Sequence, residues 1–162
     1  MMVQDIMSGD PACCTPEQPV RDAARLMHEH DCGCIPVEDP KTHRLLGVVT
    51  DRDIAVRVIA NGRNPDTPVG DAMSPDPSCC HVDDALVRAE EIMAERQVRR
   101  VPIIDEEGCC VGIVSQADLA RASQRNDAVT ERELARVVER ISEPNGHTRA
   151  QVDVGDHPSP RH

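Results

Sequence analysis

The sequence predicts a mixed α/β (α+β) fold, in which two β-α-β-β-α repeats pack with pseudo-twofold symmetry. The repeats share an offset of 66 residues as far as Asp39 and of 65 from Gly47 onward, so the second copy is one residue shorter in its hairpin. A duplicated unit usually forms two similar halves that bury apolar surface against each other, and a cleft between halves is a natural ligand site. Three phrases return in the second half: Asp5-Ile6-Met7-Ser8 as Asp71-Ala72-Met73-Ser74, Ile35-Pro36-Val37 as Val101-Pro102-Ile103, and Gly47 to Asp53 as Gly112 to Asp118.

Each element of the first copy follows from its local pattern. Apolar residues at Val20, Ala23, Ala24 and Met27 are spaced for one buried helix face. A glycine after an asparagine is typical of a helix end, and Gly62 follows Asn61. The expected order is a strand at 12–15, a helix at 20–30, a strand at 35–38, a turn at 40–43, a strand at 45–50 and a helix at 51–60.

The second copy repeats this order over residues 78–123, with its hairpin turn at 105–108. Beyond it, Thr130 and Glu133 form a capping box, and Leu134, Val137 or Val138, and Ile141 form an apolar stripe. We expect this helix to dock on a neighbouring helix or on a partner chain. The expected organisation is a first repeat at 1–62, a linker at 63–69, a second repeat at 70–125, a C-terminal helix at 126–142 and a disordered tail at 143–162.

Composition argues against several classes of function. The 162-residue chain is 39% hydrophobic, yet it has no Phe, Tyr or Trp and carries a net charge of −11. Bases then have no aromatic side chain to stack on, and phosphates have no basic face, so we expect no nucleic-acid partner. No apolar stretch is long enough to cross a membrane, and no signal peptide begins the sequence. We therefore expect no membrane partner and a cytoplasmic location, where thiols stay reduced.

The strand-to-helix turns carry a family signature. Gly47 to Asp53 in the first copy and Gly112 to Asp118 in the second share the pattern Gly-x-x-Thr/Ser-x-x-Asp, and the phrases Thr50-Asp51-Arg52-Asp53-Ile54 and Val98-Arg99-Arg100-Val101-Pro102 add to the signature. Together with the repeated apolar-Pro-apolar strands, they resemble a tandem pair of CBS domains, a Bateman module, of the stand-alone bacterial type. The resemblance extends over about residues 1–123.

The resemblance implies a regulatory sensor that binds an adenosine ligand (AMP, ADP, ATP or S-adenosylmethionine) between the repeats, with no required cofactor. It also implies a homodimer and a signal to an unknown protein partner. By the same resemblance, Asp53 and Asp118 would hold ribose, and Thr50 and Ser115 would face phosphate. The walls of the adenine slot would be Ile35, Pro36 and Val37 in one copy and Val101, Pro102 and Ile103 in the other.

The same residues allow a simpler interpretation. Thr-x-x-Asp and Ser-x-x-Asp are also variants of the helix capping box. Gly33 would leave room for close ligand approach, while Arg52, Arg99 and Arg100 are either phosphate contacts or solvated arginines. Because the copies differ at these positions, we expect two clefts that are not equivalent and that need not both hold a ligand.

Eight cysteines form the remaining unusual feature. In strands, adjacent residues point to opposite faces, so we expect one member of each Cys-Cys pair to be buried as a small hydrophobe. The weak metal candidates are His28, His30, Cys32 and Cys34, which straddle a helix end and a strand. A thiol- or metal-responsive stress protein with vestigial clefts is the alternative function. No nucleophile-base set or phosphate loop is present, so an enzyme is not expected.

Overall fold

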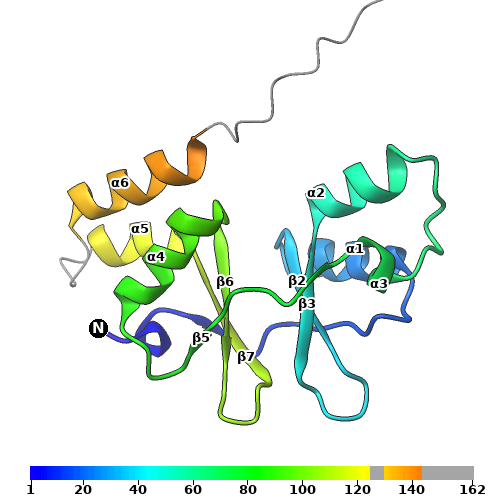
Figure 1. The fold of residues 1–162 in the computed structure, drawn as a ribbon, viewed down its shortest axis with the longest axis horizontal. Helices are drawn as coiled ribbons and strands as arrows, with labels where there is room; N and C mark the ends of the chain where they lie inside the picture. The colour runs from blue at the N-terminus through cyan, green and yellow to red at the C-terminus, as the bar shows by residue number, and fades with distance from the viewer. Residues whose placement is uncertain (125–129, 144–162) are drawn as a thin grey trace, which may run out of the picture.

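The computed structural model describes residues 1–124 and 130–143, which form two halves lying side by side (Figure 1). In each half a small sheet lies toward the centre of the molecule and helices lie on its outer side. The first half contains α1 (Val20–Glu29), β2 (Cys34–Glu38), β3 (Leu45–Thr50), α2 (Asp51–Asp53) and η2 (Ile54–Ile59). The second contains β5 (Cys80–His81), α4 (Leu86–Arg96), β6 (Arg100–Ile104), β7 (Cys110–Ser115) and α5 (Gln116–Gln124). The predicted fold class is confirmed.

Two predicted elements of the first half differ from the structure. The strand expected at 12–15 is reduced to a single bridge between Cys14 and Val37, because prolines at 11 and 16 cannot donate to a ladder. The helix expected at 51–60 has one α-helical turn and continues as the π-helix η2, where Ala60 N–H donates to Ala55 O at 2.9 Å. Its β-branched Ile and Val side chains have low α-helix propensity, which favours departure from regular α-helix.

The sheet of each half is completed by a short strand that comes from the other sequence repeat. The strand β1 (Ser8–Gly9) pairs with β7 of the second half, and β4 (Ser74–Pro75), which follows the short helix α3 (Val69–Ala72), pairs with β3 of the first. The two repeated Met-Ser phrases therefore each pair with a strand of the other repeat. The sheet orders are β1-β7-β6-β5 and β2-β3-β4.

Glycines on the two central strands allow this exchange. A Cβ atom at Gly47 would lie 2.7 Å from Ser74 O and 2.8 Å from Met73 Sδ. A Cβ atom at Gly112 would meet Met7 Sδ and would lie 3.2 Å from Ser8 O. The glycine of each Gly-x-x-Thr/Ser phrase is thus required by the crossing strand.

The halves have separate hydrophobic cores, each between a sheet and its own helices. The first core includes Val20, Ala23, Ile35, Val37 and Val49, and the second includes Met93, Val101, Ile103, Val114 and Leu119. The helix-facing sides of the sheets therefore form the cores, and these apolar faces are not the ones that meet between the halves. Their contact uses the opposite faces of the sheets and the exchanged strands.

A further helix, α6 (Glu131–Ser142), covers the outer face of the second half (Figure 1). Its N-terminus has the predicted capping box, with Glu133 N–H donating to Thr130 Oγ1 at 3.2 Å. Leu134, Val137 and Ile141 pack into the second core, which confirms docking on neighbouring helices, here α4 and α5. The start of the helix predicted at 126 and the tail predicted at 143–162 fall mainly outside the described residues. No helix among the described residues is long and apolar enough to cross a membrane.

Candidate functional site

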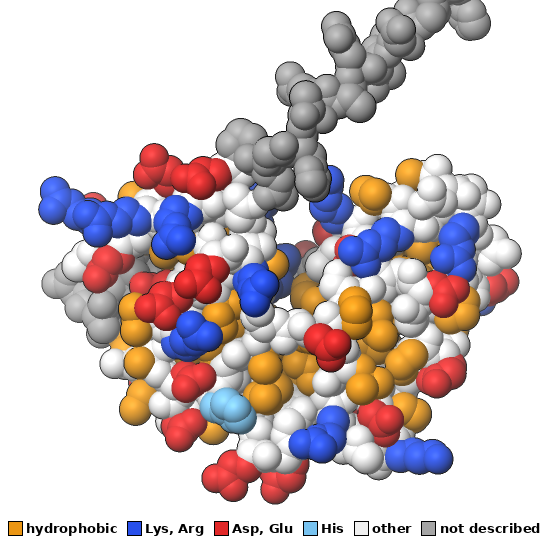
Figure 2. Space-filling model, viewed as in Figure 1, with side chains coloured by type: hydrophobic (Ala, Val, Ile, Leu, Met, Phe, Trp, Pro, Cys, Tyr) orange, Lys and Arg blue, Asp and Glu red, His pale blue; other side chains and the backbone are white. Residues whose placement is uncertain are grey.

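Strand register decides which side chains face the space between the sheets. Cys34 pairs with Thr50 on β2 and β3, and Arg100 pairs with Ser115 on β6 and β7. Because paired residues share a face and neighbours alternate, these four lie on the face opposite the helices. Figure 2 shows the surface hollowed between the two halves. We call Thr50 to Asp53 the first corner and Ser115 to Asp118 the second corner.

The adenine-slot assignment needs a correction from this register. The side chains of Ile35, Val37, Val101 and Ile103 are 0–1% exposed and belong to the helix-side cores. They cannot line a cleft, because strand alternation points them away from the other half. Of the predicted wall residues, only the two prolines lie on the face between the sheets, namely Pro36 and Pro102.

Arg100 adds a positive charge to the face between the sheets. Burial raises the pKa of Cys34 to about 12, and the Arg100 guanidinium opposes that rise from the other half. Strand register places Arg100 on the face of β6 that is turned toward the first half. No ion pair or side-chain hydrogen bond engages Arg100 within residues 1–124 and 130–143, so its donors remain available. Arg52 is exposed on the first helical turn after Thr50, while Arg99 is exposed just before β6.

The first corner is a partly satisfied capping box. Thr50 N–H donates to Asp53 Oδ2 at 2.9 Å, and Asp53 N–H donates to Thr50 Oγ1 at 3.1 Å. The closest charged group to Asp53 Oδ1 is Arg57 Nε at 3.8 Å, and the Arg57 Nη1 atom donates to the carbonyls of Ala72 and Met73 at 2.9 Å each. Among the described residues the Thr50 hydroxyl donates to no acceptor. One carboxylate oxygen and one hydroxyl proton are therefore available.

The second corner is closed by its own side chains. Asp118 Oδ2 accepts from Ser115 N–H at 2.7 Å and from the Ser115 hydroxyl at 2.6 Å. Its Oδ1 accepts from the Arg121 guanidinium. The Asp118 side chain is 7% exposed, compared with 15% for Asp53. The capping interpretation thus describes both corners, and it describes the second one completely.

Three residues of the site were not predicted from the sequence, namely Asp51, Arg57 and Arg121. A Cβ atom at Gly33 would lie 2.8 Å from Asp51 Oδ2, so the Asp51 carboxylate occupies the room that was expected for a ligand. The i,i+3 spacing of Asp118 and Arg121 was a readable signal, because such pairs meet on one helix face.

The comparison with known families agrees with this arrangement. The description "CBS domain" matches residues 3–59 and 69–125. The chain belongs to the CBS-domain family. The CBS domain-containing protein YhcV of Bacillus subtilis is 40% identical over 126 residues, which are 78% of this chain and 88% of that protein.

Three solved CBS-pair structures are similar to this one. Hypoxic Response Protein I of Mycobacterium tuberculosis, crystallised with two coordinated zinc ions, has a TM-score of 0.68 at 35% identity, over 75% of this chain and 98% of that one. CBSX2 of Arabidopsis thaliana in complex with AMP has a TM-score of 0.67 at 28% identity, over 77% of this chain and 97% of that one. The CBS pair of MJ0100 with 5-methylthioadenosine and S-adenosyl-L-methionine has a TM-score of 0.68 at 25% identity, over 75% of this chain and 98% of that one.

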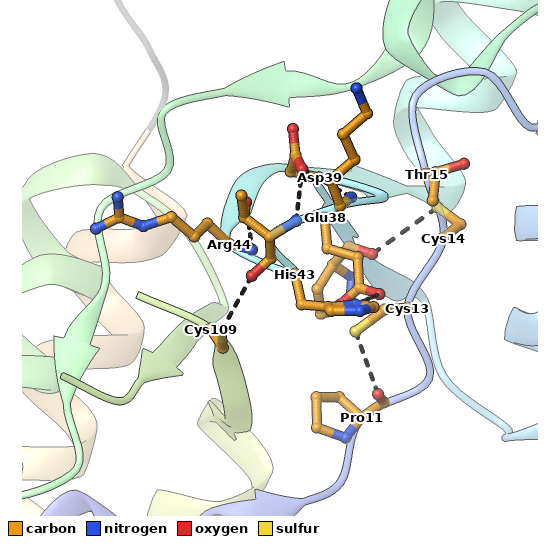
Figure 3. Close-up of polar contacts among 12 residues, drawn as sticks. Pro11, Cys13, Cys14, Thr15, Glu38, Asp39, His43, Arg44 and Cys109 are labelled. Atoms are coloured by element: carbon orange, nitrogen blue, oxygen red, sulfur yellow. Dashed lines mark hydrogen bonds and ion pairs between the residues drawn. The ribbon is translucent and has the colours of Figure 1, made fainter. Parts of the chain in front are cut away.

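Several thiols of this CBS pair lie in surroundings that raise their pKa values. Burial, followed by the Glu38 carboxylate, raises the pKa of Cys13 and of Cys14 to about 12. Figure 3 shows Cys13 beside Glu38, whose Oε1 lies 3.0 Å from His43 Nδ1. Raised pKa values are typical of structural rather than reactive cysteines.

The predicted alternation of the cysteine pairs is confirmed for two of three. Cys14 and Cys80 are buried while their neighbours are less so, but Cys109 and Cys110 are both half-buried. The reason is position, since both lie where the two hairpins meet and Cys109 Sγ donates to Thr42 O at 3.7 Å (Figure 3). The proposed metal set of His28, His30, Cys32 and Cys34 is not assembled, because no three metal-ligating side chains gather within the part of the chain described.

A cavity of about 360 Å³ lies at the opposite end of the sheets, between the hairpins. Its lining comes from both halves, including Arg44 and Leu45 from the first hairpin and Ile104 and Gly108 from the second. None of the predicted ligand residues lines it. It is therefore separate from both corners.

Proposed function

We propose that this CBS pair is a regulatory sensor that binds an adenosine ligand between its repeats and signals to a protein partner. Family membership supports the general role, since CBS pairs similar to this one were crystallised with AMP or with S-adenosylmethionine and 5-methylthioadenosine. The observation that carries the proposal to this chain is the first corner, where the Thr50 hydroxyl donates to no described acceptor and Asp53 Oδ1 has only a long ion pair with Arg57, while Arg100 lies on the facing side of the other sheet.

The chemistry of the first corner suits a phosphorylated nucleoside. Asp53 Oδ1 can accept the hydroxyl protons of a ribose. The Thr50 hydroxyl and the helix start behind it favour an anion, and Arg52 and Arg100 supply positive charge from the two halves. AMP, ADP and ATP therefore suit this corner better than the cationic S-adenosylmethionine.

The mechanism follows from the position of the ligand. A molecule that contacts Asp53 on one half and Arg100 on the other binds best when the halves are close, so it shifts the population toward a closed arrangement. A partner that recognises this arrangement, or a homodimer of the protein in the cytoplasm, would transmit the signal. In this proposal the protein carries out no catalysis.

Thermal unfolding in the presence of AMP, ADP, ATP, S-adenosylmethionine or NAD tests the proposal. A ligand that binds only the native state raises the free energy of unfolding by mass action, by about 2.7 kcal/mol at a concentration of 100 times Kd. The melting temperature rises with it. We expect a shift with AMP, ADP or ATP that is absent in Asp53→Ala. No shift with any of these compounds, or an unchanged shift in Asp53→Ala, would remove the proposal.

A thiol- or metal-responsive function is the second candidate. One observation favours it, namely the two zinc ions of Hypoxic Response Protein I, which is 35% identical to this chain. The raised thiol pKa values oppose it, because metals and oxidants react with thiolates. Elemental analysis of the purified protein, and mass spectrometry of its cysteines after oxidant treatment, separate the two candidates.

A further inference from the structure

The two corners, although built from equivalent residues, differ in what remains for a ligand. In the first, Asp53 Oδ1 has only Arg57 Nε at 3.8 Å, and the Thr50 hydroxyl keeps its proton. In the second, the Ser115 hydroxyl donates to Asp118 Oδ2 at 2.6 Å and Arg121 donates to Oδ1. Every hydrogen-bonding group that would hold a ribose is thus engaged in the second corner.

The difference depends on one pair of equivalent positions. Arg121 lies three residues after Asp118, and the residue three after Asp53 is Val56, which has no group to donate. The nearest arginine in the first half, Arg57, has Nη1 committed to the carbonyls of Ala72 and Met73. The first corner therefore has a long Arg57–Asp53 ion pair but, among the described residues, no guanidinium that donates a hydrogen bond to the Asp53 carboxylate.

We infer that the chain binds its adenosine ligand at the first corner alone, and that Arg121 excludes a ligand from the second by occupying the Asp118 carboxylate. The inference rests on the proposed function and adds its stoichiometry and the residue that sets it. A guanidinium and a vicinal diol both offer donors to a carboxylate, so the two compete for the same oxygens. Arg121 is 62% exposed at its side chain, which lets a substitution act without removing core packing.

Titration calorimetry with AMP tests this inference. We expect about one AMP per wild-type chain, and about two in Arg121→Val, with the second site within about tenfold of the first in Kd. Arg121→Ala serves as a second variant without a β-branched residue in the helix. The matched control is Arg88→Val, which removes another exposed i,i+3 arginine–carboxylate pair, with Glu91, and should keep one site.

Amide NMR identifies the corner that responds. AMP should shift the Thr50 amide but not the Ser115 amide in the wild type, and both amides in Arg121→Val. Two sites in the wild type, a Ser115 response there, or a single site in both Arg121 variants would overturn the inference and leave the proposed function intact. Absence of AMP binding in the wild type and in every variant would overturn the inference, and the proposed function for AMP with it.

Discussion

The two repeats share a topology and differ in how each is closed. The second has α6 over its helices and Arg121 on its corner, while the first leaves Val56 and Ile59 of η2 exposed at 48% and 60%. Duplication thus gave two equivalent frames, and a few added side chains made one of them structural. The comparison teaches that equivalence of motif does not establish equivalence of site, because a carboxylate already satisfied within the chain is not a ligand group.

The crossing strands should show the largest difference between the halves. Gly47→Ala places a Cβ against the Ser74 backbone carbonyl, which cannot move without disturbing β4, whereas Gly112→Ala meets mainly the flexible Met7 side chain. We expect Gly47→Ala to lower the free energy of unfolding by about 3 kcal/mol and Gly112→Ala by about 1 kcal/mol, as overpacked sites do. Urea unfolding measures both, and equal losses would contradict the assignment.

Substitution of the corner carboxylates should destabilise the protein more in the second half than in the first, which is the opposite order to that of the glycines. Asp118→Asn weakens the interactions with Ser115 and Arg121 in a nearly buried site, while Asp53→Asn affects fewer bonds. The expected losses are about 2 kcal/mol and about 1 kcal/mol. Thermal unfolding without ligand checks the order, and a greater loss in Asp53→Asn would show that the second corner is not the structural one.

The helix cap of α6 offers a smaller effect, confined to the second half. Thr130→Ala removes the acceptor for Glu133 N–H and should cost about 1 kcal/mol. Hydrogen exchange should then speed up in α6 and its contacts on α4 and α5, with α1 and η2 unchanged. Equal acceleration in both halves would indicate that α6 supports the whole molecule rather than one repeat.

The smallest effect concerns a carboxyl beneath α6. Burial, and then the Glu133 and Glu91 carboxylates, raise the pKa of Glu90, so its charged form is disfavoured in the folded state. The penalty exists at neutral pH and disappears as pH falls below the ordinary value of 4.5. Glu90→Gln should therefore stabilise by a few tenths of a kcal/mol at pH 7, given its exposure, and by nothing at pH 3.5. A gain that persists at pH 3.5 would exclude the electrostatic cause.

Much of each repeat could be predicted from local pattern. The strand at 45–50, the hairpin at 105–108 and the Thr130 cap agree with the structure because turn residues, alternation and capping act over a few neighbours. The exchange of β1 and β4 could not be predicted, although the Met-Ser phrases were visible, because a two-residue strand does not specify its partner. The corner residues were identified, but their commitment depends on Arg121 and Arg57, whose contacts only the fold reveals.

The exchange of the short strands has a consequence for dissection of the chain. Severing it between Asn61 and Pro68 would leave two pieces, each holding the arm that the other needs. The first piece would present a bare edge at β3 and the second a bare edge at β7, and unpaired edges invite association with other chains. We expect fragments made this way to associate by pairing β1 of the first piece with β7 of the second and β4 of the second with β3 of the first.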